Sequence, residues 1–270
     1  MKILAVTIAV LIARTATAAS PAASFPDVVR QIRAADYRGA RTDLQRLAVS
    51  LDGMKDPKLA AYRHYWRGFA RWRRAINGFN ETPFPPDLEQ DLKAAITSFR
   101  AALAEKPDWI EAQIGIVGCA GNLLFLARED APRREALLKD YMPVAQVMKE
   151  KGASNPRALW LMGATQLGYR GDPPGAVDTF RRGIEAALAE ARGTAKDEPV
   201  WVPRWGGAEN LMNLAYLYSH SALANRGLAL AYAEGALVAA PEWHYVRDIL
   251  WPQILELPPP SAVPSPSPAP

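Results

Sequence analysis

Three segments of this chain repeat one spacing of small and aromatic residues, and that spacing limits the possible folds more than any other feature. The residues are Ala95, Phe99, Ala102 and Pro107; Ala229, Ala233, Ala236 and Pro241; and Ala176, Phe180 and Gly183. Positions four and seven apart lie on one helix face, where small residues let another helix approach closely, and proline ends a helix. Because such a helix cannot bury its face alone, the recurrence predicts a stack of similar helical hairpins.

The two ends of the chain differ from the part between them. Lys2, an apolar run over 3–13 and an Ala-x-Ala end at Ala18 are typical of a secretory signal peptide, so we expect residues 1–18 to direct export to the periplasm or the outside. Arg14 beside the cleavage point leaves an uncleaved anchor as an alternative. Residues 258–270 are almost entirely Pro, Ser, Ala and Val, which is typical of a disordered, extended tail.

Composition is consistent with an ordered core between these ends. Hydrophobic residues make up 49% of the 270 residues, which excludes a wholly disordered chain. Cys119 is the single cysteine, so no intrachain disulfide can form. Removal of Lys2 and Arg14 with the leader leaves 30 basic residues (32 minus 2) against 28 acidic ones, a charge too small to indicate nucleic-acid binding.

Residues 25–257 are predicted to form about four to five helical hairpins and a C-terminal capping helix, without a convincing strand. Glycines at 115, 118 and 121 require a close partner helix, since each otherwise costs a helix roughly 1 kcal/mol. A long loop is expected at 193–207. The expected helices span 36–51, 57–77, 87–105, 109–128, 132–151, 156–169, 174–192, 208–220, 228–240 and 243–257.

At this point the sequence resembles the tetratricopeptide repeat (TPR). Residues 95–107 match the second half of the repeat, 156–180 match almost a whole repeat, and 208–241 match another, while Gly183 and the long loop depart from the pattern. The resemblance implies an all-α, right-handed superhelical solenoid of antiparallel hairpins. It also implies a scaffold or receptor whose concave face, lined by the first helix of each hairpin, binds a protein or peptide.

Four arginines form one ridge of the helix expected at 57–77. Arg63, Arg67, Arg71 and Arg74 lie opposite an aromatic stripe, and guanidinium groups bind carboxylates through paired hydrogen bonds. We therefore interpret Arg63, Arg67 and Arg71 as candidate partner-binding residues. The alternative is a solvated face paired with neighbouring acids.

Two further sets of residues are candidates for binding. Asn213, Tyr216 and His220 lie on the first helix of the last hairpin, and the asparagine resembles the backbone-clamping asparagine of peptide-binding TPR proteins; helix packing is the alternative. Trp201 and Trp205 lie in the long loop, where they form either a lid over the groove or a filler between hairpins.

Catalytic machinery is not evident in the sequence. His64, His220 and His244 form no His-x-x-x-His pair for zinc, and Cys119 lies in an apolar helical pattern with no histidine nearby. There is no nucleophile elbow, phosphate-binding loop or dinucleotide fingerprint. We expect a protein that is not an enzyme and needs no metal or cofactor.

The sequence therefore predicts an exported TPR-like scaffold that binds a protein or peptide on its concave face, without nucleic acid and without a stable membrane span after cleavage. An extracytoplasmic small-molecule binding protein associated with a transporter is one alternative, and it predicts a closed apolar pocket under the Trp201 loop. A structural subunit of an envelope assembly is the other, and it predicts a large exposed apolar patch.

Overall fold

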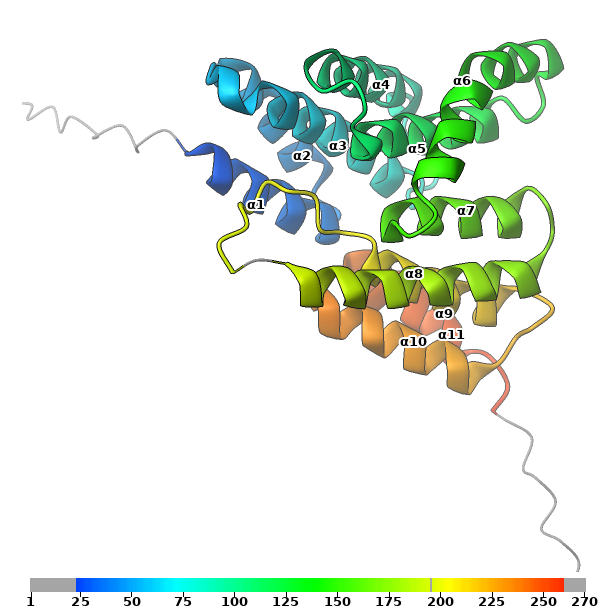
Figure 1. Cartoon of the computed structure of the whole chain (residues 1–270). Helices are drawn as coiled ribbons and strands as arrows, with labels where there is room; N and C mark the ends of the chain where they lie inside the picture. The colour runs from blue at the N-terminus through cyan, green and yellow to red at the C-terminus, as the bar shows by residue number, and fades with distance from the viewer. Residues whose placement is uncertain (1–22, 195, 260–270) are drawn as a thin grey trace, which may run out of the picture.

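The computed structural model describes residues 23–194 and 196–259. The predicted leader at 1–18 and most of the predicted tail lie outside these ranges. Long helices follow one another in pairs joined by short loops (Figure 1). The pairs are α1 (Phe25–Tyr37) with α2 (Arg41–Ser50), α3 (Ala60–Gly78) with α4 (Leu88–Glu105), α5 (Ile110–Leu126) with α6 (Ala131–Lys151), α7 (Pro156–Gly168) with α8 (Pro173–Gly193), and α9 (Gly207–His220) with α10 (Arg226–Ala239).

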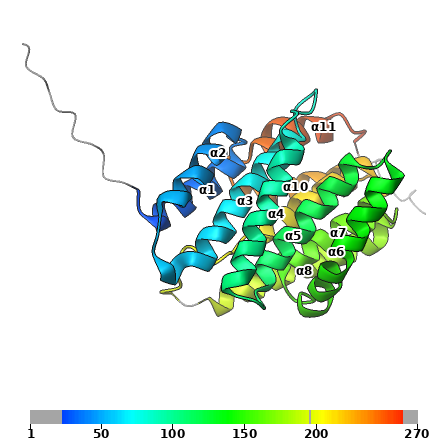
Figure 2. The ribbon, with the colours of Figure 1, turned by 90° about the horizontal axis from the view of Figure 1, so that it is seen from above.

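Each hairpin packs against the next one along the chain. The two helices of each pair contact each other, and α2, α4 and α8 also contact the first helix of the following hairpin. The first helices α1, α3, α5, α7 and α9 contact one another in that order and form an inner layer. Seen from above, α1 to α5 lie side by side in chain order (Figure 2). No strand occurs among the residues described. The predicted all-α, TPR-like solenoid of antiparallel hairpins is confirmed.

The repeated ladder residues occupy the contacts between these helices. Phe99 of α4 is completely buried, and a Cβ at Gly115 of α5 would collide with its ring. A Cβ at Gly118 would likewise collide with the buried indole of Trp72 on α3. Two of the three glycines of α5 therefore lie where an aromatic side chain packs on the helix backbone. This close packing offsets the free energy that glycine costs a helix.

The first hairpin differs from the sequence prediction. A helix was expected over 36–51, but the chain turns at Gly39, whose φ of +69° favours glycine, and α2 begins only at Arg41. A separate helix, α1, precedes the turn and begins with a capping box in which the Ser24 and Asp27 side chains satisfy each other's backbone amides. The prediction missed α1 because its apolar pattern is short and follows soon after the apolar segment of the predicted leader.

The last described helices pack against the first hairpin. After α10 comes a helical cap, a π-helix (Tyr245–Leu250) followed by α11 (Trp251–Leu255), which contacts α10. Trp243, just before this cap, packs edge-on against Tyr37 of α1 with ring centroids 5.1 Å apart. The Tyr37 hydroxyl also donates to Glu209 of α9 at 3.2 Å. The first and last hairpins are therefore joined, and the inner layer is closed along this edge.

Candidate functional site

The loop between α8 and α9 lies against the inner layer of helices. Figure 1 shows it in yellow, running beside α1 before it returns to α9. Trp205 is only 4% exposed, and its ring lies 5.6 to 5.7 Å from the rings of Phe69, Trp72 and Trp160. Its indole Nε1 donates to the hydroxyl of Tyr65 at 2.8 Å. Trp205 therefore fills the concave face from within.

Trp201 anchors the same loop nearer the N-terminal edge. Its half-buried indole packs on Phe25 of α1 at a centroid distance of 5.8 Å, and its carbonyl oxygen accepts a hydrogen bond from the Trp66 indole at 2.8 Å. Trp201 and Trp205 thus pack against α1 and α3, respectively. These contacts are those expected of a loop that fills a gap between hairpins, and the role as a lid stays a prediction.

A buried arginine of α7 holds the loop in place. The Arg157 Nη1 donates to the Trp205 carbonyl at 2.9 Å, and the guanidinium also pairs with Glu190 of α8 at 2.6 Å and Glu111 of α5 at 2.7 Å. These carboxylates keep the pKa of Arg157 above its usual value although burial opposes the charge. One side chain therefore ties the loop to two hairpins.

What remains open on the inner face is a cavity of about 410 Å³, which we call the inner pocket. It is lined by residues of α3, α5, α7 and α9 and by the start of the cap. Five of its twelve lining residues are aromatic, namely Phe79, Trp160, Tyr216, Trp243 and Tyr245. Burial raises the pKa of Tyr245 to about 12, so its phenol remains neutral. The solenoid thus presents a compact aromatic cavity in place of a continuous groove.

The polar groups of the inner pocket centre on a buried ion pair. Arg73 of α3 donates from Nε to Asp36 of α1 at 2.7 Å, and both side chains are almost completely buried. Burial opposes both charges and raises the pKa of Asp36, while the neighbouring carboxylate raises that of Arg73. Among the described residues, neither Arg73 Nη1 nor the Nε1 of Trp160 has a hydrogen-bond partner. Both of these atoms are buried, so Arg73 and Trp160 line the pocket with their other atoms.

Three asparagines of the lining share one arrangement. Asn77, Asn122 and Asn213 each donate from Nδ2 to a backbone carbonyl, at 3.1, 2.8 and 3.1 Å. Since a carbonyl only accepts, each amide turns its NH₂ group toward the backbone. These bonds tie three side chains of the lining to the backbone of α1, α5 and α9.

The structure places two of the three predicted α9 residues in this pocket. Asn213 and Tyr216 line it, while His220 stacks on Tyr216 with ring centroids 4.4 Å apart and an angle of 12°. Phe79, also of the lining, packs edge-on with Phe84 and Phe125, which are 45% and 41% exposed. An apolar rim therefore extends from the pocket to the surface.

The arginine ridge lies on another side of α3, away from the aromatic inner wall. Arg67 pairs with Asp52 after α2 and donates to Ser98 Oγ of α4 at 3.2 Å. Arg74 pairs with Asp87 and Asp91 at the start of α4. Arg63 donates to the carbonyl of Met54, and Arg71 is half-buried. The ridge faces neighbouring hairpins and the loop before α3, and its binding role stays a prediction.

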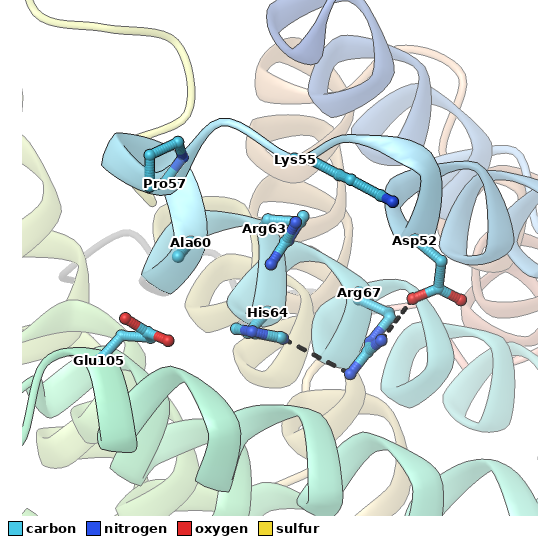
Figure 3. Close-up of a pocket in the computed structure, with 8 residues that line it drawn as sticks. All are labelled: Asp52, Lys55, Pro57, Ala60, Arg63, His64, Arg67 and Glu105. Carbon is cyan, nitrogen blue, oxygen red and sulfur yellow. Dashed lines mark hydrogen bonds and ion pairs between the residues drawn. The ribbon is translucent and has the colours of Figure 1, made fainter.

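Part of this ridge borders a second cavity, which we call the arginine pocket. Figure 3 shows Arg63, His64 and Arg67 of α3 beneath the loop that carries Lys55, with Asp52 beside Arg67 and Glu105 of α4 across the opening. The cavity measures about 530 Å³. Burial, followed by the charges of Arg67 and Arg63, lowers the pKa of His64. Burial and the two arginine charges thus disfavour the protonated form of His64.

Neither cavity has an evident nucleophile or metal centre. Across the described parts of the chain, no three His, Cys, Asp or Glu side chains are grouped so that they could hold a metal ion. Cys119 is completely buried, and burial raises its thiol pKa well above the usual value. Of the helices described, none is both long and apolar enough to cross a membrane.

Comparison with known proteins gives little beyond the fold. No family model and no curated protein matches the chain. Among solved structures, the crystal structure of a thermophilic TPR protein from Thermus thermophilus is similar, with 17% identity and a TM-score of 0.45, over 80% of this chain and 99% of that one. At this level of similarity the neighbour indicates neither ligand nor partner. The class of the protein, a TPR-like helical-hairpin solenoid, follows from its own hairpins.

Sequence reasoning missed several residues of the inner pocket. Arg73 was passed over because it lies beside the ridge of Arg63, Arg67 and Arg71, one position away from the face that drew attention. Trp160 lies in the segment that best matches the repeat, but it was not predicted to be a binding residue. Helical periodicity could have identified Arg73. It is four residues after Phe69 and therefore lies on the aromatic face of α3.

Proposed function

We propose that this protein is a non-catalytic binding protein whose inner pocket receives a short segment of a protein partner. The observation that carries the proposal is the convergence of four inner helices and the cap on one cavity lined by five aromatic side chains and by Arg73. Aromatic side chains and arginine are also the residues that most often anchor protein partners.

The filled concave face limits what this segment can be. An extended peptide along the whole groove would overlap Trp205, which lies among Phe69, Trp72 and Trp160. A chain end or a loop tip would enter the inner pocket while the rest of the partner rests on the rim of Phe84 and Phe125. The exposed rim favours a partner larger than the cavity itself.

A small-molecule ligand is the second candidate, and the cavity volume favours it. About 410 Å³ falls within the range of roughly 300–1,000 Å³ that small-molecule sites occupy. The inner pocket lies near the cap, and a separate cavity of about 390 Å³ is lined by Trp201 together with Phe25, Met54 and Leu59. Export by the leader at 1–18 is part of the proposal for either candidate, and cell fractionation with sequencing of the mature amino terminus tests it.

The test compares two tyrosine variants of the full chain. Tyr216→Ala removes a wall of the inner pocket, whereas Tyr169→Ala removes a 57% exposed tyrosine that does not line it. A partner captured by crosslinking is then purified and titrated against each variant. We expect Tyr216→Ala to weaken its binding about tenfold or more and Tyr169→Ala to leave it unchanged.

Equal affinity of the partner for both variants would place the binding surface elsewhere. Native mass spectrometry of the purified chain serves the second candidate: a bound small molecule that is lost with Tyr216→Ala and kept with Tyr169→Ala would favour the small-molecule function over the protein partner.

A further inference from the structure

The arginine pocket gathers basic side chains from two separate elements. Arg63 and Arg67 come from successive turns of α3, and Lys55 comes from the loop before it. With His64 neutral, these three cations exceed the two carboxylates of the lining, Asp52 and Glu105, by one charge. This cavity shares no lining residue with the inner pocket.

Contacts within the protein already hold both guanidinium groups in place. Arg63 donates to the backbone carbonyl of Met54, and Arg67 is held by Asp52 and by Ser98 Oγ. A guanidinium has five N–H donors, so these bonds leave others available. Because the side chains are ordered before a ligand arrives, little further rotamer entropy is lost on binding.

The carboxylates do not cancel the field where the cations meet. Asp52 is engaged with Arg67, and Glu105 lies on the opposite side of the hollow (Figure 3). Burial lowers the pKa of His64 most, and the charges of Arg67 and Arg63, which are part of the charge count above, lower it further. An anion would therefore lie beside Lys55, Arg63 and His64, with Glu105 opposing it.

We propose that the arginine pocket binds a phosphate group carried by a larger molecule. A phosphate monoester carries about −1.5 to −2 charges near pH 7 and has three acceptor oxygens, which suits donors that approach from Lys55 and from two turns of α3. A carboxylate is planar and has only two oxygens. The volume of about 530 Å³ leaves room for the rest of the molecule.

The experiment titrates the full chain with inorganic phosphate and with glycerol 3-phosphate by calorimetry at constant ionic strength. Arg63→Gln removes a guanidinium of the pocket, and we expect about tenfold weaker binding. Glu105→Gln removes the opposing charge and should tighten binding about threefold. Arg46→Gln is the matched control, since Arg46 is an exposed arginine of α2 outside the pocket lining.

Lys55→Gln repeats the test at an exposed loop position where packing is not at risk, and about threefold weaker binding is expected. The proposal is overturned by the absence of saturable binding of both phosphates, by equal weakening in Arg63→Gln and Arg46→Gln, or by acetate binding as tightly as phosphate. Tyr216→Ala in the inner pocket should leave phosphate binding unchanged, so this test fails or succeeds independently of the proposed function.

Vesicles distinguish the two sources of such a phosphate. Co-sedimentation with phosphatidylcholine vesicles that contain phosphatidic acid, lost in both Arg63→Gln and Lys55→Gln, would assign the phosphate to a lipid headgroup. Binding of glycerol 3-phosphate without co-sedimentation would assign it to a soluble phosphomonoester. Either result supports the phosphate site, and failure of both overturns it.

Discussion

Helix α3 has a buried aromatic face and a partly exposed arginine face. Its inner face carries Tyr65, Trp66, Phe69 and Trp72, each at most 2% exposed and packed against one another or against Trp205. Its other face carries arginines, such as Arg67 with 22% of its side chain exposed, which pair with acids at the hairpin boundaries. Burial of aromatic area stabilises far more than partly solvated ion pairs do. The inner face of α3 therefore contributes most of its stabilisation of the fold, whereas substitutions on the arginine face should be tolerated better.

The strongest test of this comparison is Trp205→Ala. It would leave a cavity between Phe69, Trp72 and Trp160, and we expect the free energy of unfolding to fall by about 3–5 kcal/mol. Urea denaturation measures it, with the half-buried Trp201→Ala as the matched control, which should cost less. A loss below about 1 kcal/mol would show that the loop is not part of the core.

Arg157 tests how firmly the loop is held on that inner face. Arg157→Met keeps the apolar stem but leaves Glu111 and Glu190 without their guanidinium, so we expect a loss of roughly 3 kcal/mol. A double-mutant cycle with Glu111→Gln isolates the pair, and the double variant should regain part of the loss. Simple additivity of the two changes would mean that the ion pair is not coupled.

The pH dependence of stability sharpens the same point. Burial opposes the charge of Glu190, yet Arg157 and Arg204 hold its pKa below the ordinary value of 4.5. A carboxyl with a lowered folded-state pKa stabilises the fold above its unfolded pKa, and this stabilisation is lost as pH falls through the folded value. Glu190→Gln should flatten the fall in unfolding free energy between about pH 6 and about pH 3. Glu129→Gln, at a 91% exposed carboxylate, should follow the unaltered chain.

The smallest effects are expected on the arginine face. Arg67→Ala breaks the pair with Asp52, whose side chain is 49% exposed, and should cost about 0.2–1 kcal/mol. Arg71→Ala should change the free energy of unfolding by no more than about 0.5 kcal/mol. Thermal denaturation of both variants measures whether Arg67→Ala destabilises the protein more than Arg71→Ala does. Losses comparable with that of Trp205→Ala would erase the distinction between the two faces of α3.

Much of the fold could be predicted because local spacing encodes helix faces. Ala95, Phe99 and Ala102 predicted a closely packed helix, and α4 buries all three completely. The glycines of α5 indicated a tight approach, and Phe99 and Trp72 make it. The helix predicted over 36–51 was wrong at its start, because the chain turns at Gly39 and one glycine in a helical pattern does not by itself reveal a positive φ.

The candidate site was predicted only in part. Asn213 and Tyr216 were found because a first-helix position implies the inner face, and both line the inner pocket. Their partners Arg73, Asn122 and Trp160 come from three other helices, and no spacing along the chain relates them. The inward position of Trp205 was equally out of reach, because its neighbours are more than forty residues away in the sequence.

The sequence by itself determined the helices after the first one, their order and the faces of small residues through which consecutive hairpins stack, because these depend on periodicity within about twenty residues. Only the tertiary structure decided that Tyr37 meets Trp243, that Trp205 fills the concave face, and that Arg73 faces the inner pocket while Arg63 faces another. These are contacts between distant segments, selected by the burial of aromatic surface and by the need of each buried charge for a partner.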